Sequence, residues 1–309
     1  MRHLLTLLEL SSDEIRRIFQ LSKELKTKLQ EGFREPILQG RVQALLFEKP
    51  SLRTRVSFET GMAHLGGTTL FLGSEVGWGK RESAYDFSQV LSQYVDVVVC
   101  RANSHARVEE LAKYCTCPVV NGLTDVAHPC QALADLFTLD EIHGPLEGKR
   151  LAYIGDANNV ARSLAVACGK LGVEFAIASP AKYQFDRAFL EQLTVAAPEV
   201  RLLQTLDPKE AVAGAIGVYT DVWTSMGQEA ESETRRQAFA NFQVNAALME
   251  QAPEGAVFLH CLPAKRGEEV TDEVIDGHYS AVLVQAANRM HVQKGLLAWL
   301  LHEVNGGRE

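Results

Sequence analysis

Basic and hydroxyl-bearing residues are concentrated just after the apolar segment 42–47. Ser51, Arg53 and Thr54 fall within four positions, and Pro50-Ser51 predicts a helix start with Ser51 as the N-cap. The first-turn N–H groups of such a helix lack intrahelical partners and lie at the positive end of its dipole. A forked guanidinium and a hydroxyl add further donors. The segment therefore predicts a phosphate site; a capped surface helix with salt-bridged arginines is an alternative of equal weight.

The sequence His128-Pro129-Cys130-Gln131 indicates a second helix start. Proline suits the first helical position, and His128 and Gln131, three residues apart, can point to one side. Because a helix N-terminus disfavours charged histidine, His128 is expected to be neutral and able to donate to a carbonyl oxygen. Arg101 follows the Val-rich segment 97–99. Both features also have ordinary interpretations, His-Pro as a helix entry and Arg101 as a surface or interface arginine.

Polar residues also follow other strand-like segments. Ligands of open parallel sheets bind at the carboxyl ends of the strands, which makes candidates of Asn159, Asp221, His260 and Cys261. Taken singly, Asp221 is better explained as a cap and Cys261 as a small buried apolar residue. The segment Gly155-Asp156-Ala157-Asn158-Asn159 follows a strand and opens a helix but lacks G-x-G-x-x-G, so no nicotinamide cofactor is expected.

The elements that must position these side chains alternate between strand and helix. Short apolar runs bounded by turn residues predict strands at 42–47, 95–100, 118–121, 150–155, 174–178, 215–219 and 256–260. Helical patterns lie at 107–114 and from about residue 159 onward. The alternation predicts an α/β fold of two doubly wound parallel-sheet domains, the first ending near residue 140.

Length and composition limit the class of protein. A chain of 309 residues favours two domains of about 150 residues. Its 31 Lys and Arg against 39 Asp and Glu give a formal charge of −8, which argues against a nucleic-acid partner. No signal-peptide core follows Met1 and no apolar run reaches about 18 residues, so we expect a cytoplasmic protein without a membrane segment. The spacing of the six cysteines favours free thiols.

In their order along the chain, these motifs resemble the aspartate/ornithine carbamoyltransferase family, and most closely its ornithine branch. The resemblance covers essentially the whole chain through 47–59, Arg101, 128–131, 155–159, 221–227, 260–263 and Asn288-Arg289. It implies transfer of a carbamoyl group from carbamoyl phosphate to the δ-amine of L-ornithine, in arginine metabolism, without metal or cofactor. It also implies a carbamoyl phosphate domain at 1–140, an ornithine domain at 141–286, and a last helix, about 287–303 within 287–309, that returns to the first domain. The family's catalytic unit is a homotrimer with active sites at subunit boundaries.

The resemblance also assigns roles to individual residues. Carbamoyl phosphate would be bound by Ser51, Leu52, Arg53, Thr54, Arg101, His128, Gln131, Cys261, Leu262 and Arg289. Among them, Arg101 and His128 would stabilise the carbonyl oxygen as charge develops on it. Cys261 would contact the reacting amine rather than act as a covalent nucleophile. Ornithine would be held by Asn159, Asp221, Ser225 and Met226.

The chain departs from the family pattern in two places. Leu52 stands where the family usually has threonine, which removes a hydroxyl but keeps the backbone N–H. Trp78 is unusual in the loop 75–83, which in the family reaches a neighbouring subunit's site, and we expect Trp78 to Arg81 to contribute across that boundary.

These departures define the alternatives. Both resemble the N-acylornithine carbamoyltransferases, the nearest alternative, whereas the motifs around Asp221 and Cys261 do not match the aspartate enzymes. A catalytically inert family member acting as a binding subunit is an alternative from another class. The presence of Arg53, Arg101 and His128 argues against it.

Overall fold

The computed structural model describes residues 1–224 and 229–304, and the chain divides into two compact units. Unit 1 comprises Met1–Ala134 and Asn288–Glu309, and unit 2 comprises Asp135–Ala287. Each unit contains one parallel sheet flanked by helices, which confirms the predicted α/β class. None of the described helices is long and apolar enough to cross a membrane.

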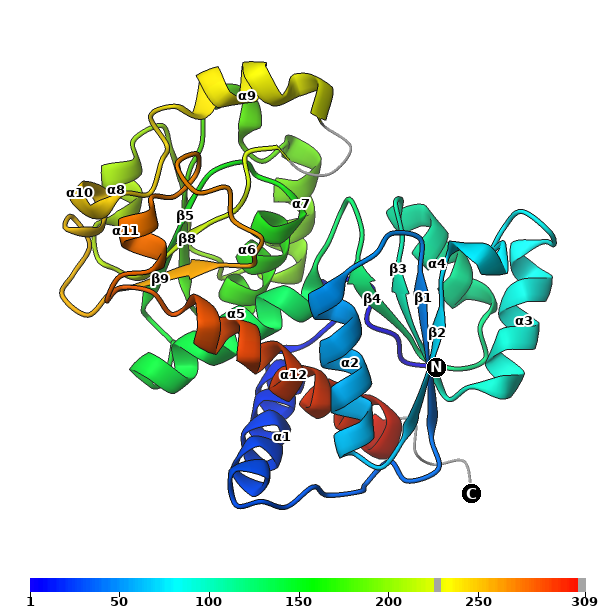
Figure 1. Cartoon of the computed structure of the whole chain (residues 1–309). Helices are drawn as coiled ribbons and strands as arrows, with labels where there is room; N and C mark the ends of the chain where they lie inside the picture. The colour runs from blue at the N-terminus through cyan, green and yellow to red at the C-terminus, as the bar shows by residue number, and fades with distance from the viewer. Residues whose placement is uncertain (225–228, 305–309) are drawn as a thin grey trace. The chain divides into compact units, whose positions relative to one another are not determined.

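Unit 1 has a four-stranded parallel sheet in the order β2-β1-β3-β4. The strands are β1 (Val42–Phe47), β2 (Thr68–Leu72), β3 (Val97–Arg101) and β4 (Val119–Leu123). The helices are α1 (Ser12–Gln30), α2 (Leu52–His64), α3 (Ala84–Tyr94) and α4 (His105–Tyr114), with a 3-10 turn η1 (Ser74–Val76). Figure 1 shows α2 on one side of this sheet and α3 and α4 on the other. All five residues of β3 are buried, as expected for a strand covered on both faces.

Unit 2 has a five-stranded parallel sheet in the order β7-β6-β5-β8-β9. The strands are β5 (Arg150–Ile154), β6 (Glu174–Ala178), β7 (Leu202–Thr205), β8 (Ala215–Thr220) and β9 (Val257–His260). The helices are α6 (Asn159–Leu171), α7 (Arg187–Ala196), α8 (Pro208–Val212), α9 (Ser232–Phe239), α10 (Ala246–Met249) and α11 (Asp272–Ile275), with 3-10 turns η2 (Ala181–Tyr183) and η3 (Glu229–Glu231). In Figure 1, α6 and α7 lie on one side of the sheet and α8, α10 and α11 on the other.

Two helices belong to both units. The chain passes from unit 1 to unit 2 within α5 (Pro129–His143) and returns within α12 (Val282–Ala298), which continues as the π-helical segment η4 (Trp299–Val304). In unit 1, a methyl group on Gly295 of α12 would lie only 2.7 Å from the Ile18 carbonyl oxygen of α1. Because a glycine there lets the backbones approach, the last helix packs against the first, and the expected return of the chain end is confirmed.

The expected strands all form, with ends shifted by a few residues, but two strands were not expected. Strands β2 and β7 lie at sheet edges, and neither contains a buried residue. Their half-exposed sequences lack the continuous apolar run that marks a strand buried on both faces. The last helix also begins earlier than predicted, at Val282.

Candidate active site

The first turn of α2 has the predicted capped start. The Ser51 hydroxyl accepts a hydrogen bond from the Thr54 N–H (3.3 Å). The Leu52 side chain is 76% exposed, so the loss of a family hydroxyl there leaves no buried gap. Arg53 is half-buried, and its guanidinium makes no hydrogen bond or ion pair within the described part of the chain. The turn therefore keeps one guanidinium and its leading N–H groups available for an anion.

Arg55, two residues further on, has a different role. Its guanidinium lies 3.8 Å from the centre of the Phe71 ring and is paired with Glu59 (2.9 Å). Both contacts lie on the surface of α2 and β2. The salt-bridged surface arginine that the sequence left open is therefore Arg55, and the guanidinium of Arg53 remains available for the predicted phosphate site.

Arg289 connects three segments of unit 1. Its side chain, 3% exposed, donates to the Thr54 hydroxyl (3.0 Å) and to the Gln131 side-chain oxygen. Thr54 and Gln131 are also buried, and both are neutral. The end of the chain thus brings a charged guanidinium to the starts of α2 and α5.

Arg101 and His128 are buried in the same unit, at the carboxyl end of β3 and immediately before α5. Burial holds the pKa of His128 well below its ordinary value of 6.5, and the positive charges of Arg289 and Arg101 lower it further. His128 is therefore neutral at physiological pH, as the sequence predicted. The two nearby guanidiniums create a positive potential in a buried place, which is the electrostatic complement of an anion.

In unit 2, Asp221 lies at the carboxyl end of β8 and is 7% exposed. Its carboxylate accepts hydrogen bonds from the Asn158 amide (2.9 Å), the Val222 N–H (2.8 Å) and the Cys261 thiol (3.1 Å). Cys261 follows β9, the strand next to β8. Two candidates predicted from strand ends therefore meet, around a carboxylate held by three donors.

Asn158 was not among the predicted site residues. It caps α6 by accepting from the N–H groups of Val160 (2.9 Å) and Ala161 (3.1 Å), while its amide nitrogen binds Asp221. The predicted residue, Asn159, is half-buried and occupies the first helical position. The Asn-Asn pair signalled a helix start, but only the fold shows that Asn158 is the one bound to the carboxylate.

The turn after β9 is held by a buried histidine and glutamate, of which Glu269 was not predicted. The His260 ring accepts the Leu262 N–H at Nδ1 (2.9 Å), so its Nε2 carries the proton and donates to Glu269 (3.2 Å). Leu262 has φ +57, a left-handed conformation that is unusual for a leucine, and its peptide bond to Pro263 is cis. The bond to His260 fixes the peptide unit between Cys261 and Leu262 at the start of this turn.

The chemistry of this cluster fits hydrogen bonding better than metal binding. Asp221, His260 and Cys261 each place a potential ligand atom within 4.8 Å of the others. However, both ring nitrogens of His260 are engaged, by Leu262 and Glu269. A metal ion would have to displace one of these buried bonds, which is costly.

Two predicted residues and one loop need separate comment. Ser225 and Met226 lie outside the described residues. The expectation that Trp78 reaches across a subunit boundary is wrong for that side chain, because Trp78 is 6% exposed and stacks on Phe87 of its own unit. Arg107 covers the Trp78 ring (4.2 Å) and donates to its carbonyl (3.0 Å). The exposed basic residues of the loop are Lys80 and Arg81.

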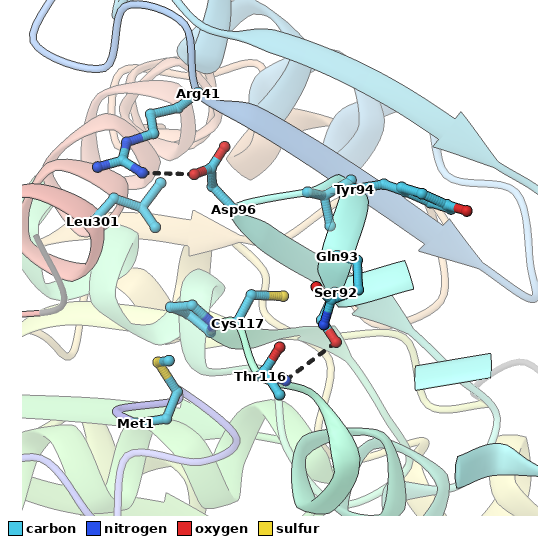
Figure 2. Close-up of a pocket in the computed structure, with 11 residues that line it drawn as sticks. Met1, Arg41, Ser92, Gln93, Tyr94, Asp96, Thr116, Cys117 and Leu301 are labelled. Atoms are coloured by element: carbon cyan, nitrogen blue, oxygen red, sulfur yellow. Dashed lines mark hydrogen bonds and ion pairs between the residues drawn. The ribbon is translucent and has the colours of Figure 1, made fainter. Parts of the chain in front are cut away.

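A cavity of about 330 Å³ in unit 1 contains none of the predicted site residues. It lies where β1, β3 and β4 begin, lined by Arg41, Asp96 and Cys117 among others, with the Arg41–Asp96 ion pair (2.7 Å) at its wall (Figure 2). Ligands of parallel sheets bind at the opposite, carboxyl ends of the strands. The charge of this cavity is already balanced by the ion pair, so we assign the substrates elsewhere.

Comparisons with known proteins agree with the fold. The chain belongs to the aspartate/ornithine carbamoyltransferase family: residues 2–141 match its carbamoyl-P binding domain and residues 147–300 its Asp/Orn binding domain. Relatives named ornithine carbamoyltransferase include the protein of Anoxybacillus flavithermus, 52% identical over 300 residues, which are 96% of each chain. The Bacillus subtilis relative is 51% identical over 98% of this chain and 94% of its own length. The solved ornithine carbamoyltransferase of Pyrococcus furiosus is 46% identical, with a TM-score of 0.94 over 98% of both chains.

Proposed function

We propose that this chain is an enzyme that transfers the carbamoyl group of carbamoyl phosphate to the δ-amine of L-ornithine, giving L-citrulline and phosphate. The observation that carries the proposal is the buried positive cluster of unit 1, where Arg289 binds Thr54 and Gln131 and the charges of Arg289 and Arg101 act on neutral His128. Such a cluster suits a small dianion with a carbonyl group. Relatives named for ornithine support the choice of acceptor.

The residues that bind carbamoyl phosphate have separate roles. We assign the phosphate group to Ser51, the Leu52 N–H, Arg53 and Thr54 at the start of α2, and the carbonyl oxygen to Arg101 and neutral His128. When the neutral amine attacks the carbonyl carbon, a carbon–nitrogen bond forms, the carbon–oxygen bond to phosphate breaks, the phosphate leaves with the bonding electrons, and the amine nitrogen loses one proton. Donors fixed in advance around the developing negative charge are each worth about 3 kcal/mol.

The acceptor residues lie in unit 2. The Asp221 carboxylate attracts the ammonium of an unblocked amino acid, and Cys261, bound to it, is placed to contact the attacking amine. We assign Asn159, with Ser225 and Met226, to the rest of ornithine, and the Leu262 carbonyl, with Cys261, to the carbamoyl amide. Accordingly, residues 1–140 with 287–309 bind carbamoyl phosphate and residues 141–286 bind ornithine.

An N-acylated acceptor is the nearest alternative. It lacks the α-ammonium charge that the Asp221 carboxylate would attract. Incubating the purified protein with carbamoyl phosphate and a panel of amines, followed by mass identification of the ureido product, tests the proposal. A higher kcat/KM for N-acetyl- or N-succinylornithine than for ornithine would overturn it, and the absence of any product would favour an inert subunit.

We further propose a cytoplasmic homotrimer that serves arginine biosynthesis. Exposed apolar side chains gather on α2 and the neighbouring β2: Leu52 (76%), Val56 (48%) and Leu70 (44%). Contact with a second copy would cover them, with Lys80 and Arg81 positioned to reach its site. Free thiols at all six cysteines fit a reducing compartment, and one relative, 47% identical, is named as the anabolic enzyme of Pyrococcus furiosus. Light scattering that shows a fully active monomer would refute the trimer.

A further inference from the structure

The outer edge of β9 ends in an unusual hydrogen bond. Strand β9 is an edge strand, and the Phe258 N–H on its open side donates to the Tyr279 carbonyl (2.7 Å). Two residues further on, the next N–H on that side belongs to His260. It donates to the side-chain oxygen of Gln285 in α12 (2.9 Å). A side-chain amide thus takes the place of a neighbouring strand at the last residue before Cys261.

Asp135 determines which way this amide faces. The Gln285 nitrogen donates to the Asp135 carboxylate (2.6 Å), and the two side chains are 1% and 0% exposed. The amide nitrogen also lies 3.4 Å from the Tyr219 hydroxyl. The amide nitrogen donates to Asp135, so the amide oxygen faces His260 and accepts its N–H. The pair therefore has one favourable arrangement.

We infer that Gln285 and Asp135 are positioning residues that hold Cys261 against Asp221 for the attack of the amine. On its inner edge, His260 pairs with Thr220, the residue before Asp221. With Gln285 on the outer edge, the end of β9 is fixed from both sides. The Cys261 thiol is consequently held 3.1 Å from the Asp221 carboxylate. The inference rests on the proposed function, but the position of the thiol can be measured without turnover.

Exchanging the side-chain amide of Gln285 and the carboxylate of Asp135 tests the inference. Gln285→Glu alone sets two carboxylates against each other, and Asp135→Asn alone removes the group that selects the amide orientation. The double variant, Asp135→Asn with Gln285→Glu, restores one donor between them and an acceptor for His260. We expect each single variant to raise the KM for ornithine about tenfold, the scale of a hydrogen bond to a charged group. The KM for carbamoyl phosphate should stay within about twofold, and the double variant should recover ornithine binding to within about threefold of the original.

Alkylation of Cys261 by iodoacetamide, followed by peptide mass in the absence of substrates, supplies the independent measurement. We expect it to be about tenfold faster in the single variants, because the thiol is released from Asp221, and near the original rate in the double variant. Gln293→Leu is the matched control, since Gln293 is a fully buried glutamine of α12 whose amide has no partner among the described residues. The inference is overturned if Gln293→Leu has the same effect, if the single variants leave Cys261 unchanged, or if the double variant is unfolded or no better than the single ones. If the alkylation rates follow this expectation but the original protein does not carbamoylate ornithine, the proposed function is contradicted instead.

Discussion

The two units prepare their halves of the chemistry in opposite ways. In unit 1, cationic side chains are buried among neutral donors, and the positive charges of Arg101 and Arg289 lower the pKa of His128. In unit 2, the central group is the Asp221 carboxylate, surrounded by an amide, a backbone N–H and a thiol. Unit 1, the half that binds the carbamoyl donor and is called the donor half below, gains most of its electrostatic stabilisation when an anion binds. Unit 2, the half that binds the carbamoyl acceptor and is called the acceptor half below, already has hydrogen-bonded partners around Asp221 and depends on their placement.

The largest expected effect is in the donor half. Arg101→Ala and Arg53→Ala should each lower kcat/KM for carbamoyl phosphate at least about 100-fold, because each removes a charged donor to the substrate. Steady-state kinetics on variants with native circular dichroism measures this. Arg55→Ala is the matched control and should stay within about threefold, since its guanidinium covers Phe71 and pairs with Glu59. Full activity of both site variants would remove the basis for a phosphate site on α2.

The acceptor half should show a more selective effect. Asp221→Asn keeps the size of the side chain but removes the charge that attracts an ammonium. We expect the KM for ornithine to rise at least about tenfold, while the KM for carbamoyl phosphate changes by less than about twofold. Initial rates with each substrate varied in turn measure both constants. Equal losses for the two substrates would show that Asp221 supports the fold as a whole rather than the acceptor.

Acid should lower the free energy of unfolding through two buried histidines of unit 1. Burial, then the charges of Lys294 and Lys26, lower the pKa of His291 to about 4, and that of His128 is also well below 6.5. Above pH 6.5 these groups are neutral in both folded and unfolded chains, so they do not alter stability. Below it the unfolded chain binds more protons, and the free energy of unfolding should fall between about pH 6.5 and 4.

Urea unfolding across that pH range measures the effect. His128→Gln removes one of the groups that takes up a proton on unfolding, so its free energy of unfolding should fall less steeply with acid than that of the original chain. Parallel curves for the two proteins would contradict the link between His128 and acid sensitivity.

The smallest effect is expected at Trp78. Trp78→Phe should leave kcat/KM within about threefold, because the ring packs on Phe87 and Arg107 of its own unit rather than on a substrate. A modest decrease in Tm, from the weakened contact with Arg107, is the expected change and can be measured by calorimetry. A large loss of activity at unchanged Tm would instead show that Trp78 acts at the substrate site.

Local signals explain which residues the sequence could predict. Ser51 and His128 begin helices, and serine, proline and their neighbours mark helix starts wherever they occur. Arg101, Asp221 and Cys261 were predicted because they end apolar strands. Arg289 came only from the resemblance to the family, since it lies within a long helix and nothing near it in the sequence indicates its contact with Thr54.

Two of the residues that the sequence missed act through distant partners. Asn158 binds a carboxylate 63 positions away, and Gln285 binds one 150 positions away. No period, cap or turn connects such pairs, so only the folded sheet reveals them. Trp78 shows the converse error, because a tryptophan in a glycine-rich loop suggested an exposed contact and proved to be part of the core.

The passage of the chain through α5 and α12 has a consequence for biosynthesis. Unit 2 is a contiguous stretch inserted into unit 1, so a ribosome delivers all of it before it releases the segment from Asn288 onward. Domains generally fold as their residues emerge. Arg289 is therefore synthesised after both sheets, 235 residues later than Thr54 and 158 residues later than Gln131. A nascent chain that stops before Asn288 can contain both sheets and still lack Arg289. Its carbamoyl phosphate site is then incomplete.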